Sequence, residues 1–338
     1  MSIKTGILTF QNANNYGAVL QAFALQTILE DMGHQASVIN YDSPNMGLKQ
    51  YHTDIFIKFI SKYLNLTDEY RDGQDIDTNG FDMVITGSDQ VWNPEITKGD
   101  ETYFLKLRNC TCKLSSYAAS IGISGGTLSQ HADFFKDNLE RIENISIRES
   151  TQKDFIESIS GKKVNVNVDP TLLLDAEAYK KAFGLKNDIS EHIFMYSNNV
   201  DPHLLDFVNL LSLKEGAPIF AVSNYDKPSF VGRENKVFYQ VNPVDWLSAI
   251  LSAKIVVTDS FHGLMFALIF EKPFYIYTKK RSNISRITDV LEACGLSDRT
   301  LKNLPSIDDV DYAPDFSRAR VMISREREKS LEYLKQLI

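Results

Sequence analysis

The feature that most constrains the fold of this chain is a repeated order of strand, polar loop and helix. Residues 5–10 form a short apolar run typical of a buried strand, and a polar loop follows at 11–16. Residues 17–32 then carry apolar side chains at helical spacing, and residues 38–41 supply the next strand. Strands that alternate with helices predict a parallel sheet covered by helices.

The same order recurs along the rest of the chain. Further strands are predicted at 81–86, 114–118, 142–147 and 164–168. A second series begins near residue 192, with strands at 193–196, 218–222, 254–258 and 274–277 and helices at 204–213, 243–252 and 261–270. The 338 residues are enough for about two domains, so the sequence predicts an α/β fold with two parallel sheets.

The boundary between the domains is predicted at 175–190, where polar and charged residues form a solvated connection. We expect an N-terminal domain at 1–180, a C-terminal domain at 190–312 and a final helix at 313–338. That helix carries an apolar stripe that includes Val321 and Leu334, which predicts that it packs on a domain.

Overall charge and the apolar runs argue against several classes of protein. A net charge of −8 argues against a nucleic-acid partner, because phosphate backbones are bound by concentrated positive charge. The longest strongly apolar run, 264–270, is shorter than the roughly 20 residues that a membrane-spanning helix needs. The first residues lack the apolar centre of a secretory signal, so we expect a cytoplasmic protein. Three cysteines cannot form a complete set of disulfides, and Cys110-x-Cys112 alone is weak evidence for a metal.

Residues 55–66 have helical apolar spacing and one polar face. The polar positions are Lys58, Ser61, Lys62 and Asn65. The usual interpretation is a helix whose apolar face packs on the core. The alternative is a peripheral contact with the inner face of the cell membrane, where a lipid-linked acceptor would be presented.

Three polar loops follow predicted strands, at 12–18, 86–92 and 258–263. In open parallel sheets, ligands bind outside the carboxyl ends of the strands, where loops enter helix N-termini and offer backbone N–H groups. These loops are therefore the candidate ligand-binding segments of the chain.

The third loop carries the residue with the clearest chemistry. The strand at 255–257 leads to Asp259 and Ser260, which are candidate helix caps, and leaves His262 in the first helical turn. A histidine in this position can act as an acid or a base near neutral pH. The residues alone leave a second interpretation open, in which His262 is a capping or core histidine.

Several segments share a pattern with one known family. Three contain the loops: 6–21 (GILTFQNANNYGAVLQ), 86–94 (TGSDQVWNP) and 258–263 (TDSFHG). The others are 145–149 (ISIRE), 168–174 (VDPTLLL) and 283–287 (NISRI). Together these segments resemble the polysaccharide pyruvyl transferase family. Their order along most of the chain is more specific than any single match.

The resemblance implies two Rossmann-like domains with parallel sheets in a glycosyltransferase-B-like arrangement, with the active site in the interdomain cleft. It implies phosphoenolpyruvate as the donor co-substrate, a saccharide as the acceptor and no separate cofactor. The product would be a cyclic ketal made in capsular or exopolysaccharide biosynthesis. Carried over to this sequence, the resemblance makes His262 the catalytic acid or base and Arg148 a ligand of the anionic donor.

One position departs from the family's pattern. Many members have an arginine two residues before the histidine, whereas this chain has Ser260, which forms the predicted donor loop with Phe261 and Gly263. Three cations follow the loop: Lys279, Arg281 and Arg286. We expect them to replace the missing arginine, because phosphoenolpyruvate carries a carboxylate and a phosphate. The alternative is a solvated basic turn.

The first two loops suit the saccharide acceptor, because they offer hydrogen-bonding groups and flat aromatic faces. The predicted acceptor-binding residues are Asn14, Asn15, Tyr16, Gly17, Ser88, Asp89, Gln90 and Trp92. The alternative for the polar residues is ordinary turn chemistry, and for Trp92 it is packing in the core.

Two other functions stay open on the sequence. A nucleotide-sugar-dependent glycosyltransferase or epimerase would have a similar two-domain architecture, since a fold does not fix the chemistry. A non-catalytic saccharide-binding relative is suggested by Ser260 in place of arginine.

Overall fold

The computed structural model describes the chain except for residues 1, 45–53, 124, 188, 198–200, 224–229, 231–234, 279–284 and 302–305. Two compact units are present: Met1–Leu174 together with Arg325–Ile338, and Asp175–Ser324. Each unit contains a parallel sheet with helices packed on it, which confirms the predicted α/β fold with two parallel sheets.

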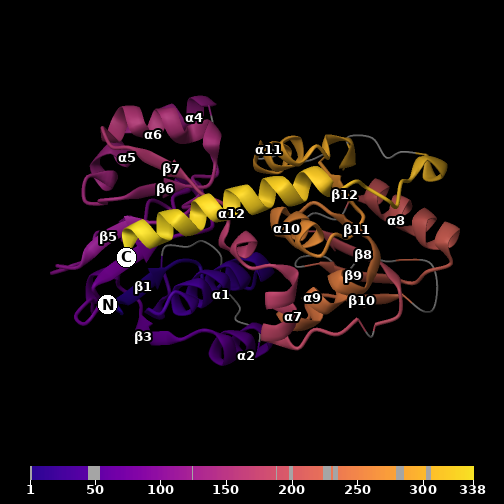
Figure 1. Cartoon of the computed structure of the whole chain (residues 1–338), viewed down its shortest axis with the longest axis horizontal. Coiled ribbons are helices and arrows are strands. Elements are labelled where there is room, and N and C mark those ends of the chain that lie inside the picture. The colour runs from indigo at the N-terminus through magenta and orange to yellow at the C-terminus, as the bar shows by residue number, and fades with distance from the viewer. Residues whose placement is uncertain are drawn as a thin grey trace. The chain divides into compact units, whose positions relative to one another are not determined.

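The sheet of the first unit has the order β3-β2-β1-β4-β5 in the described residues. Its strands are β1 (Lys4–Leu8), β2 (Gln35–Tyr41), β3 (Leu66–Tyr70), β4 (Met83–Thr86) and β5 (Lys113–Ser116), and all neighbours are parallel. β6 (Ile145–Ile147) and β7 (Val164–Val166) form a parallel pair near α5 and α6 (Figure 1). Parallel bridges from Ser115 to Asn144 and from Ala119 to Ile147 join β5 to this pair.

The helices of the first unit follow its strands along the chain. They are α1 (Tyr16–Asp31), α2 (Asp54–Tyr63), α3 (Pro94–Thr97), α4 (Gly125–Gln130), α5 (Ala132–Leu139) and α6 (Lys153–Ser160). Asn15 caps α1, because its side-chain oxygen accepts a hydrogen bond from Ala18 N at 3.2 Å. α1 is buried over most of its length and packs against β2 and the short turn Pro170–Leu173.

The segment predicted at 55–66 is helix α2 followed by the start of β3. Phe56, Phe59 and Ile60 are buried, and the Phe56 ring lies 5.2 Å from that of Tyr16. Lys58 and Lys62 are exposed. The apolar face of α2 therefore packs on the first unit, as in the first of the two interpretations offered for it.

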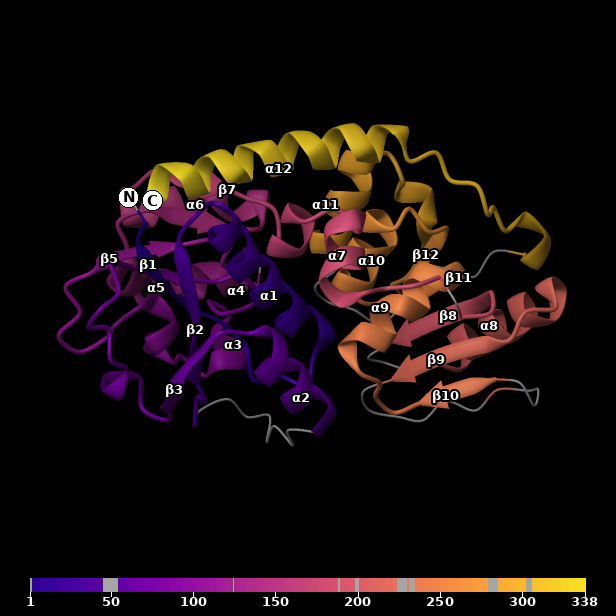
Figure 2. The ribbon, with the colours of Figure 1, turned by 60° about the horizontal axis from the view of Figure 1, so that its bottom comes forward.

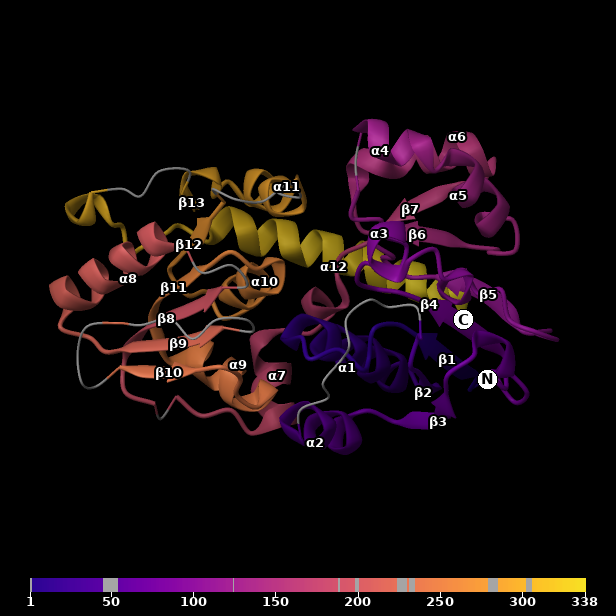
Figure 3. The ribbon, with the colours of Figure 1, turned by 180° about the vertical axis from the view of Figure 1, so that it is seen from behind.

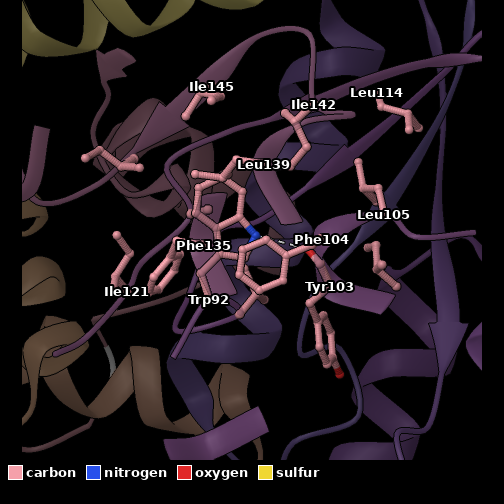
Figure 4. Packing of buried hydrophobic residues seen from close by; sticks show 14 of the residues in the cluster. Trp92, Tyr103, Phe104, Leu105, Leu114, Ile121, Phe135, Leu139, Ile142 and Ile145 are labelled. Atoms are coloured by element: carbon pink, nitrogen blue, oxygen red, sulfur yellow. Dashed lines mark hydrogen bonds between the residues drawn. The ribbon is translucent and has the colours of Figure 1, made fainter. Parts of the chain in front are cut away.

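An aromatic cluster forms much of the core beside β4 and β5 (Figure 4). The Trp92 ring stacks on Phe104 with centroids 5.2 Å apart, and its Nε1 donates to the carbonyl of Tyr103 at 3.0 Å. The Phe135 ring packs edge-on against Phe104, with ring centroids 5.8 Å apart. Burial of such side chains contributes about 1.5–3 kcal/mol each to folding.

The sheet of the second unit has the order β10-β9-β8-β11-β12-β13 within the described ranges (Figure 2). Its strands are β8 (His192–Ser197), β9 (Ile219–Ser223), β10 (Lys236–Phe238), β11 (Ala253–Thr258), β12 (Phe274–Tyr277) and β13 (Thr300–Leu301). Its helices are α7 (Ala176–Phe183), α8 (Pro202–Glu215), α9 (Pro243–Ser252), α10 (Phe261–Ile269) and α11 (Ser285–Cys294).

Successive side chains of β8 point to opposite faces of this sheet, as the strand period of two requires. Ile193 and Met195 belong to the cluster that contains the buried side chains of α8. Phe194 and Tyr196 point the other way, and their rings contact Trp246 of α9 at 6.2 and 5.3 Å. Because both faces of β8 are covered, its residues 193–196 are apolar, which explains why this strand was recognisable in the sequence.

Two details differ from the sequence-based expectation. Residues 176–183 are helix α7 and not a solvated connection, because Asp175 caps the helix and Tyr179 packs on Phe266 at 5.1 Å. In the final helix α12 (Ser317–Leu337), Leu334 is buried but Val321 is 70% exposed, so the predicted stripe is wrong at Val321.

Helix α12 contributes to both compact units. Arg320 makes a two-pronged ion pair with Glu271 of the second unit, and the Tyr333 hydroxyl donates to the carbonyl of Ser116 in the first unit. The described part of the chain contains no helix that is both long enough and apolar enough to cross a membrane.

Candidate functional site

Each sheet reverses its strand order at one point. In the first unit β1 and β4 are neighbours, with β2 and β3 on one side and β5 on the other. In the second unit the reversal lies between β8 and β11. Open α/β sheets bind ligands beyond the carboxyl ends of their strands at such reversals. The three predicted loops leave β1, β4 and β11, so each lies at a reversal.

Gln21 joins the two strand ends at the first reversal. Its side-chain nitrogen donates to Thr9 Oγ1 at 2.8 Å, and its side-chain oxygen accepts from Ser88 N at 3.2 Å. The Thr9 hydroxyl donates to the carbonyl of Ser88 at 2.9 Å. All three residues are fully buried, so the strand ends are held by internal hydrogen bonds.

The loop after β4 turns sharply at Gly87 and Asp89. Both residues have positive φ angles, 113° at Gly87 and 64° at Asp89. A Cβ at Gly87 would lie 2.4 Å from the carbonyl oxygen of Tyr117, so only glycine fits there. Asp89 Oδ1 accepts from Gln90 N at 2.8 Å, which fixes the half-buried carboxylate at the edge of the sheet.

Arg148 follows β6 and lies among carboxylates of its own unit. Its side chain is 5% exposed, Nη1 donates to Asp169 Oδ2 at 2.6 Å, and Nε lies 3.5 Å from Glu149 Oε1. Burial acts to lower the pKa of Arg148, but these carboxylates, with Asp89 as the third, raise it overall. The charge of Arg148 is therefore held in ion pairs within the first unit, and its role as a ligand of the donor anion stays a prediction.

The two carboxylates beside Arg148 are themselves held by neighbouring loops. Asp169 Oδ1 accepts from both the backbone N–H and the hydroxyl of Thr171, at 3.0 and 2.7 Å. Glu149 accepts from the Ser120 hydroxyl. The ends of β5, β6 and β7 are therefore tied together by one buried polar network.

The predicted acceptor residues divide by burial. The half-buried residues are Asn14, Asn15, Asp89 and Gln90. The buried residues are Tyr16, Gly17, Ser88 and Trp92. The stacking role predicted for Trp92 does not fit this arrangement, because the ring is 0% exposed and lies against Phe104.

The second reversal carries the histidine loop. β11 ends at Thr258, and α10 begins at Phe261 with Ser260 as its N-cap, whose Oγ accepts from Gly263 N at 3.3 Å. The predicted cap is thus confirmed for Ser260. His262 is the second residue of α10 and is 8% exposed.

Gly263 brings α10 close to the strand that precedes it, and Figure 3 shows α10 beside β11. A Cβ at Gly263 would lie 2.6 Å from Thr258 Oγ1. The same hydroxyl donates to the carbonyl of Tyr196 at 2.6 Å and accepts from Ser260 N at 3.1 Å. Gly263 therefore allows close packing of helix on strand, a recognised use of glycine at this position of α/β folds.

Arg286 is brought to the histidine loop by α11. The centre of its guanidinium lies 5.7 Å from the centroid of the Phe261 ring, and that ring lies 5.2 Å from the imidazole of His262. A guanidinium over an aromatic face is an attractive cation–π contact. Of the three predicted cations, Arg286 contacts the residue that precedes His262, while Lys279 and Arg281 fall outside the described residues.

Two buried aspartates lie near the same reversal. Asp259 is 3% exposed, and its Oδ2 accepts from the Ser197 hydroxyl at the end of β8 at 3.1 Å. Asp201 is 2% exposed and caps α8 through His203 N at 2.9 Å. Burial, together with the charge of Asp201, raises the pKa of Tyr277 to about 12, so this phenol stays protonated at neutral pH.

A family model described as polysaccharide pyruvyl transferase matches residues 15–278, well over half of the chain. This chain belongs to that family. No curated protein sequence matches it.

Solved structures with a similar fold are epimerases and glycosyltransferases. UDP-GlcNAc 2-epimerase from Methanocaldococcus jannaschii is 12% identical with a TM-score of 0.54, over 100% of this chain and 99% of the epimerase. The Neisseria meningitidis UDP-GlcNAc 2-epimerase is 10% identical with a TM-score of 0.51, over 99% and 93%. Spinosyn rhamnosyltransferase SpnG is 9% identical with a TM-score of 0.51, over 99% of each chain. At these identities the likeness concerns the fold alone, which is of the predicted glycosyltransferase-B-like class.

In this pyruvyl transferase family member, several polar residues at the reversals were not predicted. They are Gln21, Glu149, Asp169, Asp201 and Tyr277. Asp169 and Asp201 each precede a proline that opens a helix or helical turn, a pattern that marks a cap but not a ligand site. Gln21 interrupts the apolar stretch 17–25 of α1, which is a usable signal. In the described residues, no group of three or more His, Cys, Asp or Glu is placed to hold a metal ion.

Proposed function

We propose that this pyruvyl transferase family member moves a pyruvyl group from phosphoenolpyruvate to two hydroxyls of a saccharide, forming a cyclic ketal for a capsular polysaccharide or exopolysaccharide. The observation that carries the proposal is the histidine loop, where His262 lies in the first turn of α10 and the guanidinium of Arg286 contacts the ring of Phe261. An acid and a cation that contact the same loop suit a donor that must be protonated and is anionic.

The second unit is proposed as the donor side. Arg286 replaces the arginine missing at Ser260, because a guanidinium can hold a carboxylate or a phosphate through two hydrogen bonds. The first turn of α10 adds backbone N–H groups and the positive end of the helix dipole. Lys279 and Arg281 stay proposed donor ligands on the strength of the sequence.

The proposed reaction begins with protonation of the donor's methylene carbon by His262. The central carbon becomes electrophilic, and one sugar hydroxyl attacks it and loses its proton. A second hydroxyl then displaces phosphate from the same carbon and its proton goes to the departing phosphate, which closes the ketal and releases inorganic phosphate. His262 is 8% exposed, and a shielded acid limits competition from water at the activated carbon.

The first unit is proposed as the acceptor side. Its half-buried groups, Asn14, Asn15, Asp89 and Gln90, offer donors and acceptors to sugar hydroxyls. We leave Trp92 out of this set because its faces are packed in the core. We assign Arg148 to holding the loops instead of binding the donor. The proposed location is the cytoplasm, and a lipid-linked acceptor would be met at the exposed polar side of α2.

The test uses the purified chain with phosphoenolpyruvate and saccharides from the source cell. Release of inorganic phosphate and a pyruvyl mass increment on a saccharide are measured together. The matched variants are His262→Gln and His203→Gln, since each histidine is the second residue of a helix in the second unit and His203 is exposed. We expect loss of roughly 10²–10⁴-fold for His262→Gln and no change for His203→Gln.

Ligand binding provides a separate test of the donor. A ligand that binds only the folded chain raises its thermal midpoint. We expect phosphoenolpyruvate to raise the midpoint and UDP-sugars to leave it unchanged. A shift with UDP-sugars and none with phosphoenolpyruvate would favour a nucleotide-sugar enzyme and overturn the proposal.

A further inference from the structure

Cys110 and Cys112 lie together in the first unit, apart from the groups assigned to the reaction. Their Sγ atoms are 2.9 Å apart, in thiol hydrogen-bond contact. The pair precedes β5 directly and so lies at the amino end of that strand, whereas the candidate loops leave the carboxyl ends of their strands. The two thiols have no part in the proposed transfer reaction.

The surroundings of this pair are those of a reactive thiol. Both cysteines are half-buried and pack against the edge of the core cluster of the first unit. The hydrogen bond with Cys112 lowers the pKa of Cys110 to about 6, against the opposing effect of burial, and the charge of Arg141 acts in the same direction. The same hydrogen bond raises the pKa of Cys112. Partial exposure near positive charge is typical of reactive cysteines.

The third cysteine provides an internal contrast. Cys294, at the end of α11, is 2% exposed, and burial raises its pKa to about 11. It is a thiol at neutral pH and is covered by protein. Any chemistry that depends on thiolate and access should therefore distinguish Cys110 from Cys294 in the same molecule.

We propose that Cys110 and Cys112 form a reversible disulfide by exchange with a low-molecular-weight disulfide such as oxidised glutathione. The Cys110 thiolate attacks one glutathione sulfur, forms a mixed disulfide and expels the other glutathione as a thiolate. Cys112, once deprotonated, attacks Cys110 Sγ and expels the second glutathione. Two protein thiols are oxidised, and one glutathione disulfide is reduced to two thiols.

The geometry requires little movement for this bond to form. A disulfide bond is about 2.05 Å long, so the two sulfurs must approach by roughly 0.9 Å from their separation of 2.9 Å. In a reducing compartment such a bond is transient, as expected of a redox-sensing pair and not of a structural bridge.

The experiment incubates the folded, reduced full chain in glutathione buffers of increasing oxidised fraction. Remaining thiols are trapped with iodoacetamide and assigned by peptide mass. The variants are Cys110→Ser, Cys112→Ser and, as the control, Cys294→Ser, with urea-unfolded wild type as a second control. We expect the wild type to lose the thiols of Cys110 and Cys112 together and to keep that of Cys294.

The variants define the order of attack. Cys112→Ser should accumulate glutathione on Cys110, because the second thiol is absent. Cys110→Ser leaves one thiol of the pair and should form no internal disulfide. Cys294→Ser should oxidise like the wild type. Equal alkylation of Cys110 and Cys294 in the folded wild type, or oxidation of Cys110 no faster folded than unfolded, would overturn the proposal. The alkylation result does not depend on any variant folding.

Discussion

The two strand-order reversals use charge in different ways. At the first, Arg148 is enclosed by Asp169 and Glu149, and these ion pairs hold the ends of three strands. At the second, Arg286 lies over the ring of Phe261 beside His262. Arg148 contacts two carboxylates of its own unit, and Arg286 contacts an aromatic ring. Proximity to a predicted site therefore does not by itself make an arginine an anion ligand.

This contrast assigns different tasks to the two units. The first reversal is a scaffold that fixes half-buried polar groups such as Asp89 and Asn14 at the edge of the sheet. The second places a titratable imidazole and a cation at the start of a helix, where anions are also favoured by the helix dipole. Substitutions at the first reversal should therefore affect mainly stability, and those at the second mainly activity.

The largest expected effect is loss of stability when Arg148 is replaced by methionine. Breaking a buried ion pair by removing one partner costs about 3–5 kcal/mol, because the remaining carboxylates are left buried without their cation. The chain has two tryptophans, Trp92 in the first unit and Trp246 in the second. Urea unfolding followed by fluorescence in a Trp246→Phe background reports on the first unit.

The control for this prediction is Arg71→Met. The Arg71 side chain is 79% exposed and pairs with Glu69 at the surface, so its removal should leave the urea midpoint nearly unchanged. If Arg148→Met costs no more than Arg71→Met while abolishing phosphoenolpyruvate binding, Arg148 is a donor ligand after all and the contrast between the reversals is lost.

The sequence was sufficient for elements with a clear apolar pattern. α9 at Pro243–Ser252 and β12 at Phe274–Tyr277 have the predicted bounds. β3 and β10 were not predicted, because they are edge strands with few buried side chains and are defined by pairing with distant strands. Local periodicity carries no record of such backbone pairing.

The candidate site was predictable only as a set of loops. Polar residues after buried strands located all three loops, and the spacing around Ser260 predicted the helix cap. The direction of individual side chains was not predictable. Tyr16 and Trp92 turn into the core, and Arg148 meets Asp169, which is 21 residues away in the sequence. These outcomes depend on tertiary packing.

The next largest expected effect is on the binding of phosphoenolpyruvate by Arg286. A hydrogen bond to a charged group is worth about 1.5–3 kcal/mol, so Arg286→Met should raise KM for phosphoenolpyruvate by roughly tenfold or more. Arg286→Lys keeps the charge but loses the planar group, and should recover only part of the affinity. Steady-state kinetics of phosphate release measure both. Arg320→Met, at a surface pair with Glu271, is the control and should leave KM unchanged. Equal KM values for Arg286→Met and wild type would remove Arg286 from the donor site.

A smaller effect separates the two roles of Ser260. Ser260→Ala removes the cap of α10 and should lower stability by about 1 kcal/mol. Ser260→Asp keeps a capping oxygen but adds negative charge where the donor is proposed to bind. Urea unfolding should therefore rank Ser260→Asp near the wild type, while its KM for phosphoenolpyruvate rises. Asn15→Ala, which removes the corresponding cap of α1, should lower stability without raising that KM. Should Ser260→Asp leave KM unaltered, the anion does not bind at this helix start.

The smallest expected effect is that acid lowers the stability of the second unit. His192 is 2% exposed at the start of β8, and burial lowers its pKa, with Nδ1 2.9 Å from the carbonyl of Ser190. As pH falls below about 6.5, the unfolded chain binds a proton before the folded chain does. Stability contributed by the neutral imidazole is therefore complete above that pH and declines as pH falls toward the lowered folded value.

His192→Phe keeps an aromatic ring beside Phe220 and removes the titrating group. Urea midpoints at pH 7.5 and 5.5, followed by Trp246 fluorescence in a Trp92→Phe background, should fall more for the parent than for His192→Phe. The exposed His203→Phe should behave like the parent. Arg148 stays charged throughout this range. If acid lowers the urea midpoints of both units equally and His192→Phe changes neither midpoint, the acid sensitivity does not originate in this buried imidazole.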